Sequence, residues 1–180
     1  GCGVDFCGTI QSVGSAVEDV SVGDRVFGVT PGALGRRLSV PRSQVACLPS
    51  EIPLEAAAGV AHAQLLARHA LLDRAQLQPG DRVLIDAGRG AVGHALVQVA
   101  TSFSGWDARA DVAVFARAER QVGWQEAYGA RSVDGASQER FDVIIASRSG
   151  EALDDLLERL APGGRYVDLA PRGRFELPPL

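Results

Sequence analysis

The stretch DRVLIDAGRGAVGHALVQVA, residues 81–100, decides the fold of the second half of the chain. It opens with the apolar run RVLID (82–86), breaks into glycines, and continues with apolar residues at helical spacing. This order predicts a strand, a turn and a helix in direct succession. The turn follows the pattern G-x-G-x-x-G and consists of Gly88, Arg89, Gly90, Ala91, Val92 and Gly93.

Each glycine of this pattern has a physical task in a dinucleotide-binding turn. One permits the tight turn, one lets backbone N–H groups approach a pyrophosphate, and one allows the helix to pack closely on the strand. The helix that follows presents its partially positive N-terminus to the phosphates. Residues 88–93 are therefore predicted to form a dinucleotide site. The alternative is that the glycines serve only a tight strand-to-helix connection.

The end of the next strand indicates which dinucleotide is bound. In NAD-binding proteins an acidic residue at that tip holds the ribose 2′-hydroxyl. The strand DVAVFA (111–116) carries its acid, Asp111, at the opposite end, whereas Arg117 and Arg120 follow the tip. Guanidinium groups pair well with phosphate, so the sequence favours NADPH, with one or both arginines near its 2′-phosphate. The alternative is that they are solvated helix-face charges paired with Glu119.

Apolar strands and helices alternate from residue 82 onward. Further strands are expected at 111–116, 141–146 and 164–170, and strands that are apolar on both faces fit a parallel sheet covered on both sides. A helix before the last strand is expected to start at Ser149 and to be stopped by Pro162–Gly164. Its apolar stripe is Leu153, Leu156, Leu157 and Leu160. Residues 81–180 thus predict an α/β fold with a doubly wound, Rossmann-like parallel sheet.

The first part of the chain has a different character. Short β runs at 8–13, 23–29, 36–40 and 43–48 are separated by glycine turns, so residues 1–50 predict a β-rich domain. An Ala/Leu-rich helix is expected after Pro53, and it extends to Leu72 before the turn at 79–81. We therefore expect three parts, 1–50, 51–80 and 81–180.

Charge and composition exclude several classes of function. The net charge is −4 and the arginines are scattered, which leaves no basic stripe for DNA or RNA. No apolar run approaches the ~20 residues that span a bilayer, and no leader-like segment opens the chain, so we expect a cytoplasmic protein without a membrane partner. Cys2, Cys7 and Cys47 lack zinc-ligand or disulfide spacing and are expected to be buried free thiols.

Several motifs in one order resemble the medium-chain dehydrogenase/reductase superfamily. They are GVDFCGTI (3–10), VGDRVFG (22–28), EAAA (55–58), QPGDRVLI (78–85) and the glycine turn. Within that superfamily the chain is similar to the enoyl reductase domains of modular polyketide synthases and animal-type fatty acid synthases, as residues 141–170 indicate. The resemblance implies that the Rossmann-like domain is preceded by part of a GroES-like β-rich domain. Residues 1–50 are too few to close a barrel of usual size, so the remaining strands are either lost from this chain or lie elsewhere, in a longer polypeptide.

The resemblance also implies a chemistry. Enoyl reductases use NADPH to reduce an α,β-unsaturated acyl thioester on an acyl carrier protein, beside other synthase domains, and many relatives pair as homodimers. Zinc-dependent relatives have a histidine where this chain has Val4, so the zinc-free branch of quinone and enoyl reductases is implied, without a metal.

Some positions depart from the family pattern. Pro171 stands where a lysine proposed as proton donor is usual, and Leu66 and Ala146 replace a threonine and an asparagine near the nicotinamide. Gln121 replaces a lysine that contacts the 2′-phosphate, and the segment with the family's proposed catalytic tyrosine does not occur. No catalytic residue is therefore assigned.

Two interpretations follow, with a third outside the synthases. The chain is an NADPH-dependent enoyl reductase domain, or it is a catalytically degenerate domain kept for its structural role in such a synthase. A free-standing quinone reductase-like protein would require a complete β domain. Tyr128, Tyr166 and the histidines are expected to pack or to lie on helix surfaces. Among them, His94 follows the glycine turn directly.

Overall fold

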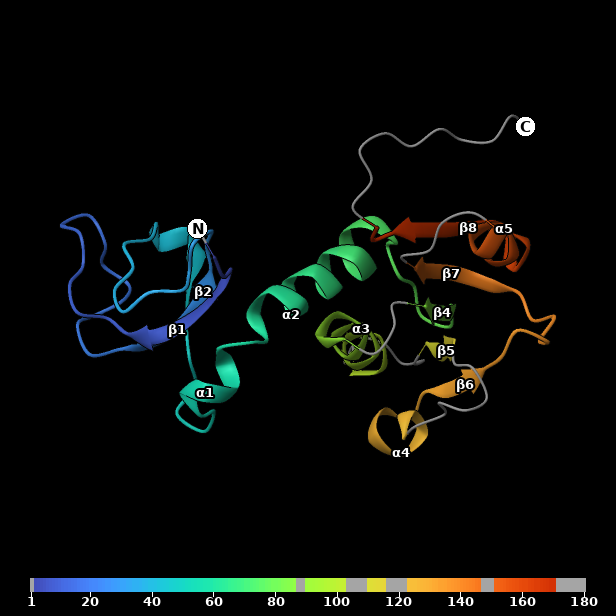
Figure 1. The fold of residues 1–180 in the computed structure, drawn as a ribbon, viewed down its shortest axis with the longest axis horizontal. Helices are drawn as coiled ribbons and strands as arrows, with labels where there is room; N and C mark the ends of the chain where they lie inside the picture. Colours follow the sequence, from blue (N-terminus) through green and yellow to red (C-terminus); the bar gives the residue numbers. More distant parts are fainter. Residues whose placement is uncertain (1, 87–89, 103–109, 116–122, 147–150, 171–180) are drawn as a thin grey trace. The chain divides into compact units, whose positions relative to one another are not determined.

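The computed structural model describes residues 2–86, 90–102, 110–115, 123–146 and 151–170. The chain forms two compact units, unit 1 (Gly1–Leu66) and unit 2 (Ala67–Leu180), and the boundary falls within helix α2 (Ala61–Arg68). Figure 1 gives the labels of the helices and strands that follow.

Unit 1 contains a three-stranded antiparallel sheet in the order β1-β2-β3. Its strands are β1 (Asp5–Thr9), β2 (Arg25–Val29) and β3 (Val45–Cys47), with the short 3-10 helix η1 (Arg42–Gln44) before β3 and α1 (Leu54–Ala57) after it. Gly28 is required by packing, since a Cβ atom there would lie 2.0 Å from the backbone oxygen of Gln44. The β-rich character expected for this part of the chain is confirmed.

Three details of the sequence-based expectation for unit 1 are wrong. The strand expected over 8–13 ends at Thr9. The chain then leaves the sheet in a loop, and the Ile10 N–H donates to the carbonyl of Asp24 where the loop closes. Residues 36–40 form no strand, because β3 occupies the place beside β2. The thiols are not buried: Cys2 and Cys47 are exposed and Cys7 is partly exposed.

The Ala/Leu-rich segment is interrupted rather than continuous. Residues 58–60 form turns around Gly59 between α1 and α2, where glycine is a weak helix former. After α2 the backbone widens into the π-helical stretch η2 (His69–Arg74), in which the Ala75 N–H donates to the carbonyl of Ala70 at 2.8 Å. Gln76 then takes a left-handed conformation with φ of 48°.

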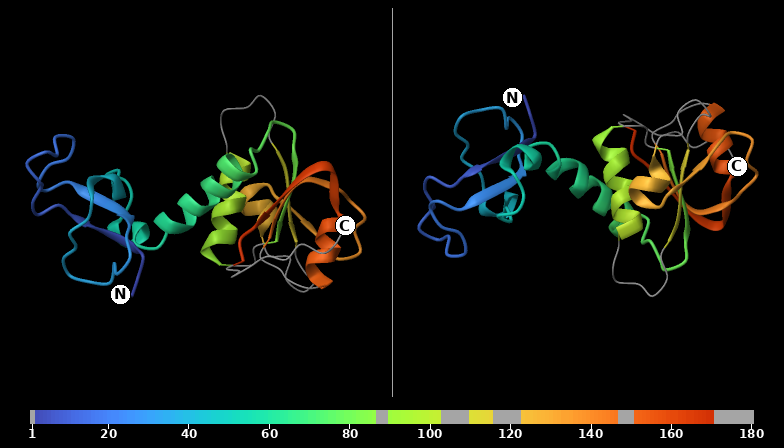
Figure 2. Two further views of the ribbon diagram at one scale, coloured as in Figure 1. Left: turned by 90° about the horizontal axis from the view of Figure 1, so that it is seen from above. Right: turned by 90° about the horizontal axis from the view of Figure 1, so that it is seen from below.

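Unit 2 is built on a parallel sheet in the order β6-β5-β4-β7-β8. The strands are β4 (Arg82–Asp86), β5 (Asp111–Phe115), β6 (Arg131–Val133), β7 (Phe141–Ala146) and β8 (Leu160–Asp168). The helices are α3 (Ala91–Ser102), α4 (Trp124–Tyr128) and α5 (Glu151–Glu158). Figure 2 shows α3 and α5 on opposite faces of this sheet. The expected doubly wound, Rossmann-like parallel sheet is confirmed.

The connection from α5 to β8 differs from the expectation. Helix α5 ends at Glu158, and Leu160 pairs with Phe141 as the first residue of β8 rather than completing the helical stripe. The Pro-Gly-Gly sequence therefore does not stop the helix. It produces a register shift inside β8, where Gly163 has φ of 75°, a conformation that suits glycine.

The core of unit 2 lies between the sheet and its covering helices. Phe141, Ile144 and Ile145 of β7 are fully buried, as is Leu84 of β4. Residues 134–140 form no helix between β6 and β7, as their short length predicts. The guanidinium of Arg159 lies 5.5 Å from the ring centre of Phe115 and covers part of the face that such a helix would protect.

Arginine residues tie the amino ends of the strands together. Arg165 donates to the carbonyls of Ala75 and Gln76 and pairs with Asp81 at 2.6 Å. Asp142 accepts the backbone N–H of Arg82 at 2.9 Å and also pairs with its guanidinium.

The ion pairs Arg82–Asp142 and Arg131–Asp111 have structural roles. The hydrogen bond from the Arg82 backbone, followed by that from its side chain, lowers the pKa of Asp142. The side-chain bonds from Arg131 to Asp111 and then to Glu139 raise the pKa of Arg131. These charges join β4 to β7 and β5 to β6 at the amino ends of the strands, away from the glycine turn.

Candidate functional site

The candidate site lies at the carboxyl ends of the central strands. β4 and β7 are neighbours, yet the chain leaves β4 toward α3 and leaves β7 toward α5, which cover opposite faces. In open α/β sheets, ligands bind in the crevice that such a divergence creates. The last paired residues here are Asp86 of β4, Ala146 of β7 and Asp168 of β8, in one register row.

The start of α3 provides backbone donors at this crevice. The first bond of the helix runs from the His94 N–H to the carbonyl of Gly90, at 3.2 Å. The N–H groups of Ala91, Val92 and Gly93 therefore precede the intrahelical ladder and belong to the donors that a helix leaves unused at its N-terminus. The first turn of α3 contains no acidic residue, so its partial positive charge is not neutralised locally.

Gly90 and Gly93 have different surroundings among the described residues. A Cβ atom built at Gly90 would meet nothing within 4 Å. Gly93, in contrast, is buried in α3. The open space beside Gly90 fits the close approach of a ligand to the backbone. The burial of Gly93 fits the packing of the helix on the strand.

The other residues predicted for the dinucleotide site are not among the described ones. Gly88 and Arg89 of the turn lie outside them, as do Arg117 and Arg120 beyond β5. Pro171 and Gln121 also lie outside the described residues. The structure thus places Gly90, Ala91, Val92 and Gly93 together at the head of α3.

Asp86 is a further polar residue at this end of the sheet, and it is not among the residues predicted from the sequence. Its side chain is 7% exposed at the end of the otherwise apolar strand β4, directly before the glycine turn. It follows Leu84 by two residues and so faces the α5 side of the sheet. A carboxylate that closes an apolar strand was the available signal, because charged residues are seldom buried.

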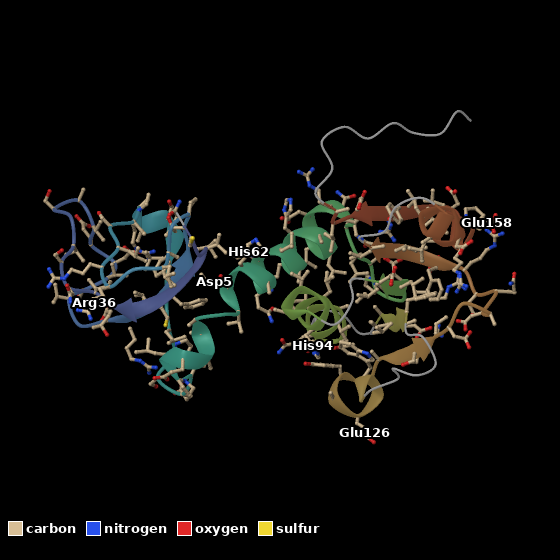
Figure 3. All side chains as sticks on the ribbon, viewed as in Figure 1. Asp5, Arg36, His62, His94, Glu126 and Glu158 are labelled. Atoms are coloured by element: carbon tan, nitrogen blue, oxygen red, sulfur yellow. The ribbon has the colours of Figure 1, made fainter. Side chains whose placement is uncertain are left out.

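The His94 side chain contacts α4. Its Nδ1 atom shares a hydrogen bond with the Tyr128 hydroxyl at 3.2 Å, and its ring centre lies 4.6 Å from that of Trp124. Figure 3 shows His94 on α3 where α4 approaches it. The expectation that His94 and Tyr128 pack rather than act as an acid or base agrees with these contacts.

The remaining residues singled out from the sequence have structural positions. Tyr166 packs against the buried cluster that includes Leu84 and Leu156. Ala146 is fully buried at the tip of β7. Leu66 is partly buried on α2. His69 pairs with Asp73 one helical turn away at 2.8 Å.

Unit 1 has its own polar contacts and a hollow. Asp5 accepts the backbone N–H of His62 at 2.6 Å and so caps the first turn of α2; both residues are labelled in Figure 3. A hollow of about 760 Å³ is lined mostly by residues of β1 and of the loops around 10–20 and 35–40, with Arg36 and Arg42 among them. Arg42 is occupied there, because it pairs with Asp19 at 2.6 Å.

Neither a metal cluster nor a membrane-spanning helix occurs among the described residues. No group of three or more histidine, cysteine or acidic side chains in that part of the chain is arranged to hold a metal ion. No helix among the same residues is long and apolar enough to cross a membrane.

Comparison with known proteins gives a consistent set of relatives. Polyketide synthase GfsB of Streptomyces halstedii is 35% identical over 182 residues, which is 96% of this chain and 3% of that protein. The solved structure of CurK enoyl reductase matches with a TM-score of 0.81 and 28% identity, over 96% of this chain and 55% of that one. Mycobacterial Rv1454c complexed with NADPH matches with a TM-score of 0.78 and 25% identity, over 99% and 58%. No family model matches the chain.

Proposed function

This chain belongs to the medium-chain dehydrogenase/reductase superfamily and is related to the enoyl reductases of polyketide synthases, and we propose that it binds NADPH as the enoyl reductase domain of such a synthase. The chain spans only a few per cent of the synthase relative and about half of the solved enoyl reductase. Neighbouring synthase domains, an acyl carrier protein that delivers the substrate, and a cytoplasmic location belong to this proposal.

The single observation that supports it most is the corner between β4 and α3. There the N–H groups of Ala91, Val92 and Gly93 precede the first intrahelical bond of α3, at the end of the sheet where the chain leaves β4 and β7 toward opposite faces. We assign the pyrophosphate to these donors and to Gly88, Arg89 and Gly90, and the 2′-phosphate to Arg117 and Arg120. The presence of NADPH in a structure of the same fold, that of Rv1454c, is consistent with this choice.

The residues at the corner define what the chain does in the reaction. NADPH, when bound, supplies a hydride for the β-carbon of an α,β-unsaturated thioester, and the α-carbon takes up a proton. The helix α3 holds the dinucleotide by its phosphates, and fully buried Ala146 leaves the tip of β7 without a polar side chain.

A second candidate function rests on Ala146 and Leu66. Both are apolar where related reductases often carry polar groups near the nicotinamide, and the structure gives Ala146 no exposed surface. This favours a domain that binds the dinucleotide and reduces thioesters slowly or not at all, and that is kept for its place in the synthase. We propose it as the alternative.

Fluorescence titration with NADPH, followed by its absorbance at 340 nm with a crotonyl thioester, separates these functions. We expect binding by the 180-residue chain. Rapid oxidation supports the reductase, binding without oxidation supports the alternative, and no binding contradicts both.

A charge placed at the head of α3 tests the binding site itself. Ala91 is exposed in the first helical turn, so Ala91→Glu suits the helix but repels a pyrophosphate there, and we expect NADPH affinity to fall about fivefold or more. Gln98→Glu adds the same charge to an exposed position two turns further along α3 and is the matched control. Equal affinities in the two variants would contradict the assigned site.

A further inference from the structure

The hollow of unit 1 has an apolar floor. Phe6 and Val45 lie opposite Gly28 on either side of β2, and Val26 is two residues from Gly28 on that strand. Phe6, Val26 and Val45 therefore point to one face of the sheet, and all three line the hollow of about 760 Å³. Sites for small organic ligands commonly have volumes of about 300–1,000 Å³, so the hollow is large enough for a ligand.

The walls of the hollow combine apolar and neutral polar side chains. Val13 and Leu38, from the loops on either side, line it and are 42% and 37% exposed. The lining also contains the amide and hydroxyl groups of Gln11, Ser12 and Ser39. A ligand that fits these walls therefore has both apolar and hydrogen-bonding parts.

Every charged residue that lines the hollow is an arginine, although the net charge of the chain is −4. Arg42 pairs with Asp19 at 2.6 Å, so its charge is offset. Arg36, labelled in Figure 3, and Arg37 are exposed. Neither of these two side chains forms an ion pair or hydrogen bond with another described residue. The hollow thus combines apolar surface with two uncompensated positive charges, which complement an anionic group.

We propose that this hollow holds the acylated phosphopantetheine arm of an acyl carrier protein, with the phosphate of the arm at Arg36 and Arg37. The choice of ligand rests on the proposed function. The arm joins an acyl chain to a phosphate through a segment with two amide groups, and the lining offers apolar, neutral polar and cationic side chains in turn. Guanidinium groups bind phosphate through paired, charge-assisted hydrogen bonds.

Two probes that differ only in the phosphate test this site by isothermal titration calorimetry of the 180-residue chain. They are hexanoyl-phosphopantetheine and hexanoyl-pantetheine. We expect the phosphorylated probe to bind about five- to tenfold more tightly, as for two exposed charge pairs. Because exposed charges are screened by salt, the difference should shrink as the ionic strength rises.

Variants separate the charge from the apolar walls. In Arg36→Gln/Arg37→Gln the two probes should bind equally, to within about twofold. Arg68→Gln/Arg140→Gln removes two exposed arginines outside the hollow and is the matched control, which should keep the full difference. Leu38→Asn reduces the apolar wall and should weaken both probes by a similar factor. If the double variant does not fold, Arg37→Gln alone should lower the difference by a smaller factor.

Several outcomes overturn the inference. They are equal binding of the two probes by the unaltered chain, a difference that persists in Arg36→Gln/Arg37→Gln, and no binding of either probe. Displacement of hexanoyl-phosphopantetheine by inorganic phosphate or hexanoate at equal concentration would mean that the hollow takes a simple anion, and displacement by NADPH would place the probe in the dinucleotide site. Each of these results leaves the proposed function standing. Conversely, a chain that shows the phosphate-dependent difference and binds no NADPH contradicts the proposed function and supports the assigned hollow.

Discussion

Replacing Arg165 by alanine should strongly destabilise unit 2. Its guanidinium donates to the carbonyls of Ala75 at 2.9 Å and Gln76 at 2.8 Å, and it pairs with the Asp81 carboxylate at 2.6 Å. These contacts hold the segment between η2 and β4, in which Gln76 has the left-handed φ of 48°. Arg165→Ala would release that strained segment and leave Asp81, whose side chain is 13% exposed, without its positive partner.

The magnitude follows from what is lost. Each charge-assisted bond to a carbonyl contributes about 0.5–1.5 kcal/mol after discounting for partial exposure, and the poorly exposed ion pair adds about 1 kcal/mol. The sum is about 2–4 kcal/mol, a large part of the 5–15 kcal/mol by which domains are commonly stable. With a denaturant slope of about 2 kcal/mol per molar urea, the midpoint should fall by about 1–2 M.

Tryptophan fluorescence in urea measures this change selectively. Both tryptophans of the chain, Trp106 and Trp124, belong to unit 2. Arg140→Ala is the matched control, because Arg140 makes one exposed bond to the carbonyl of Leu160, and we expect it to change stability by less than about 1 kcal/mol. An Arg165→Ala midpoint within error of the Arg140→Ala midpoint would refute the reasoning.

Three other substitutions have defined outcomes. Gly28→Ala would force a Cβ atom to 2.0 Å from the Gln44 backbone oxygen. The free energy of unfolding, measured by thermal denaturation with circular dichroism, should therefore fall by about 3 kcal/mol or more. Gly8→Ala is the control and should not lower it, because a Cβ atom at Gly8 would meet nothing within 4 Å. Phe141→Ala empties a fully buried site and should lower the urea stability by about 3–5 kcal/mol. The pKa of Asp142 is lowered on folding, so its contribution is present above about pH 4 and is lost as the pH falls through the folded value. Asp142→Asn should therefore flatten the acid side of the stability–pH curve, and an unchanged curve would contradict the assignment.

Much of the candidate site could be predicted because its signals are local. The apolar run of β4 and the glycines after it indicate a strand, a turn and a helix within twenty residues of sequence, and the strands 82–86 and 141–146 have the predicted bounds. Asp86 was missed because its burial at the tip of β4 depends on which segments pack beside that strand in the folded chain. The contact between His94 and Tyr128 joins residues 34 positions apart, and no periodicity connects them.

The sequence by itself determined the alternation of strands and helices and the position of the glycine segment between β4 and α3, because period, chain-breaking residues and helix caps act over a few neighbouring residues. Only the tertiary structure decided that β4 lies at the centre of the sheet, that Pro162–Gly164 form an irregularity inside β8, and that Arg165 reaches residues 75–81. Each of these three features depends on which segment of the chain packs beside which other segment. That choice is made by the total burial and pairing of residues far apart in the chain, so no local pattern of residues carries it.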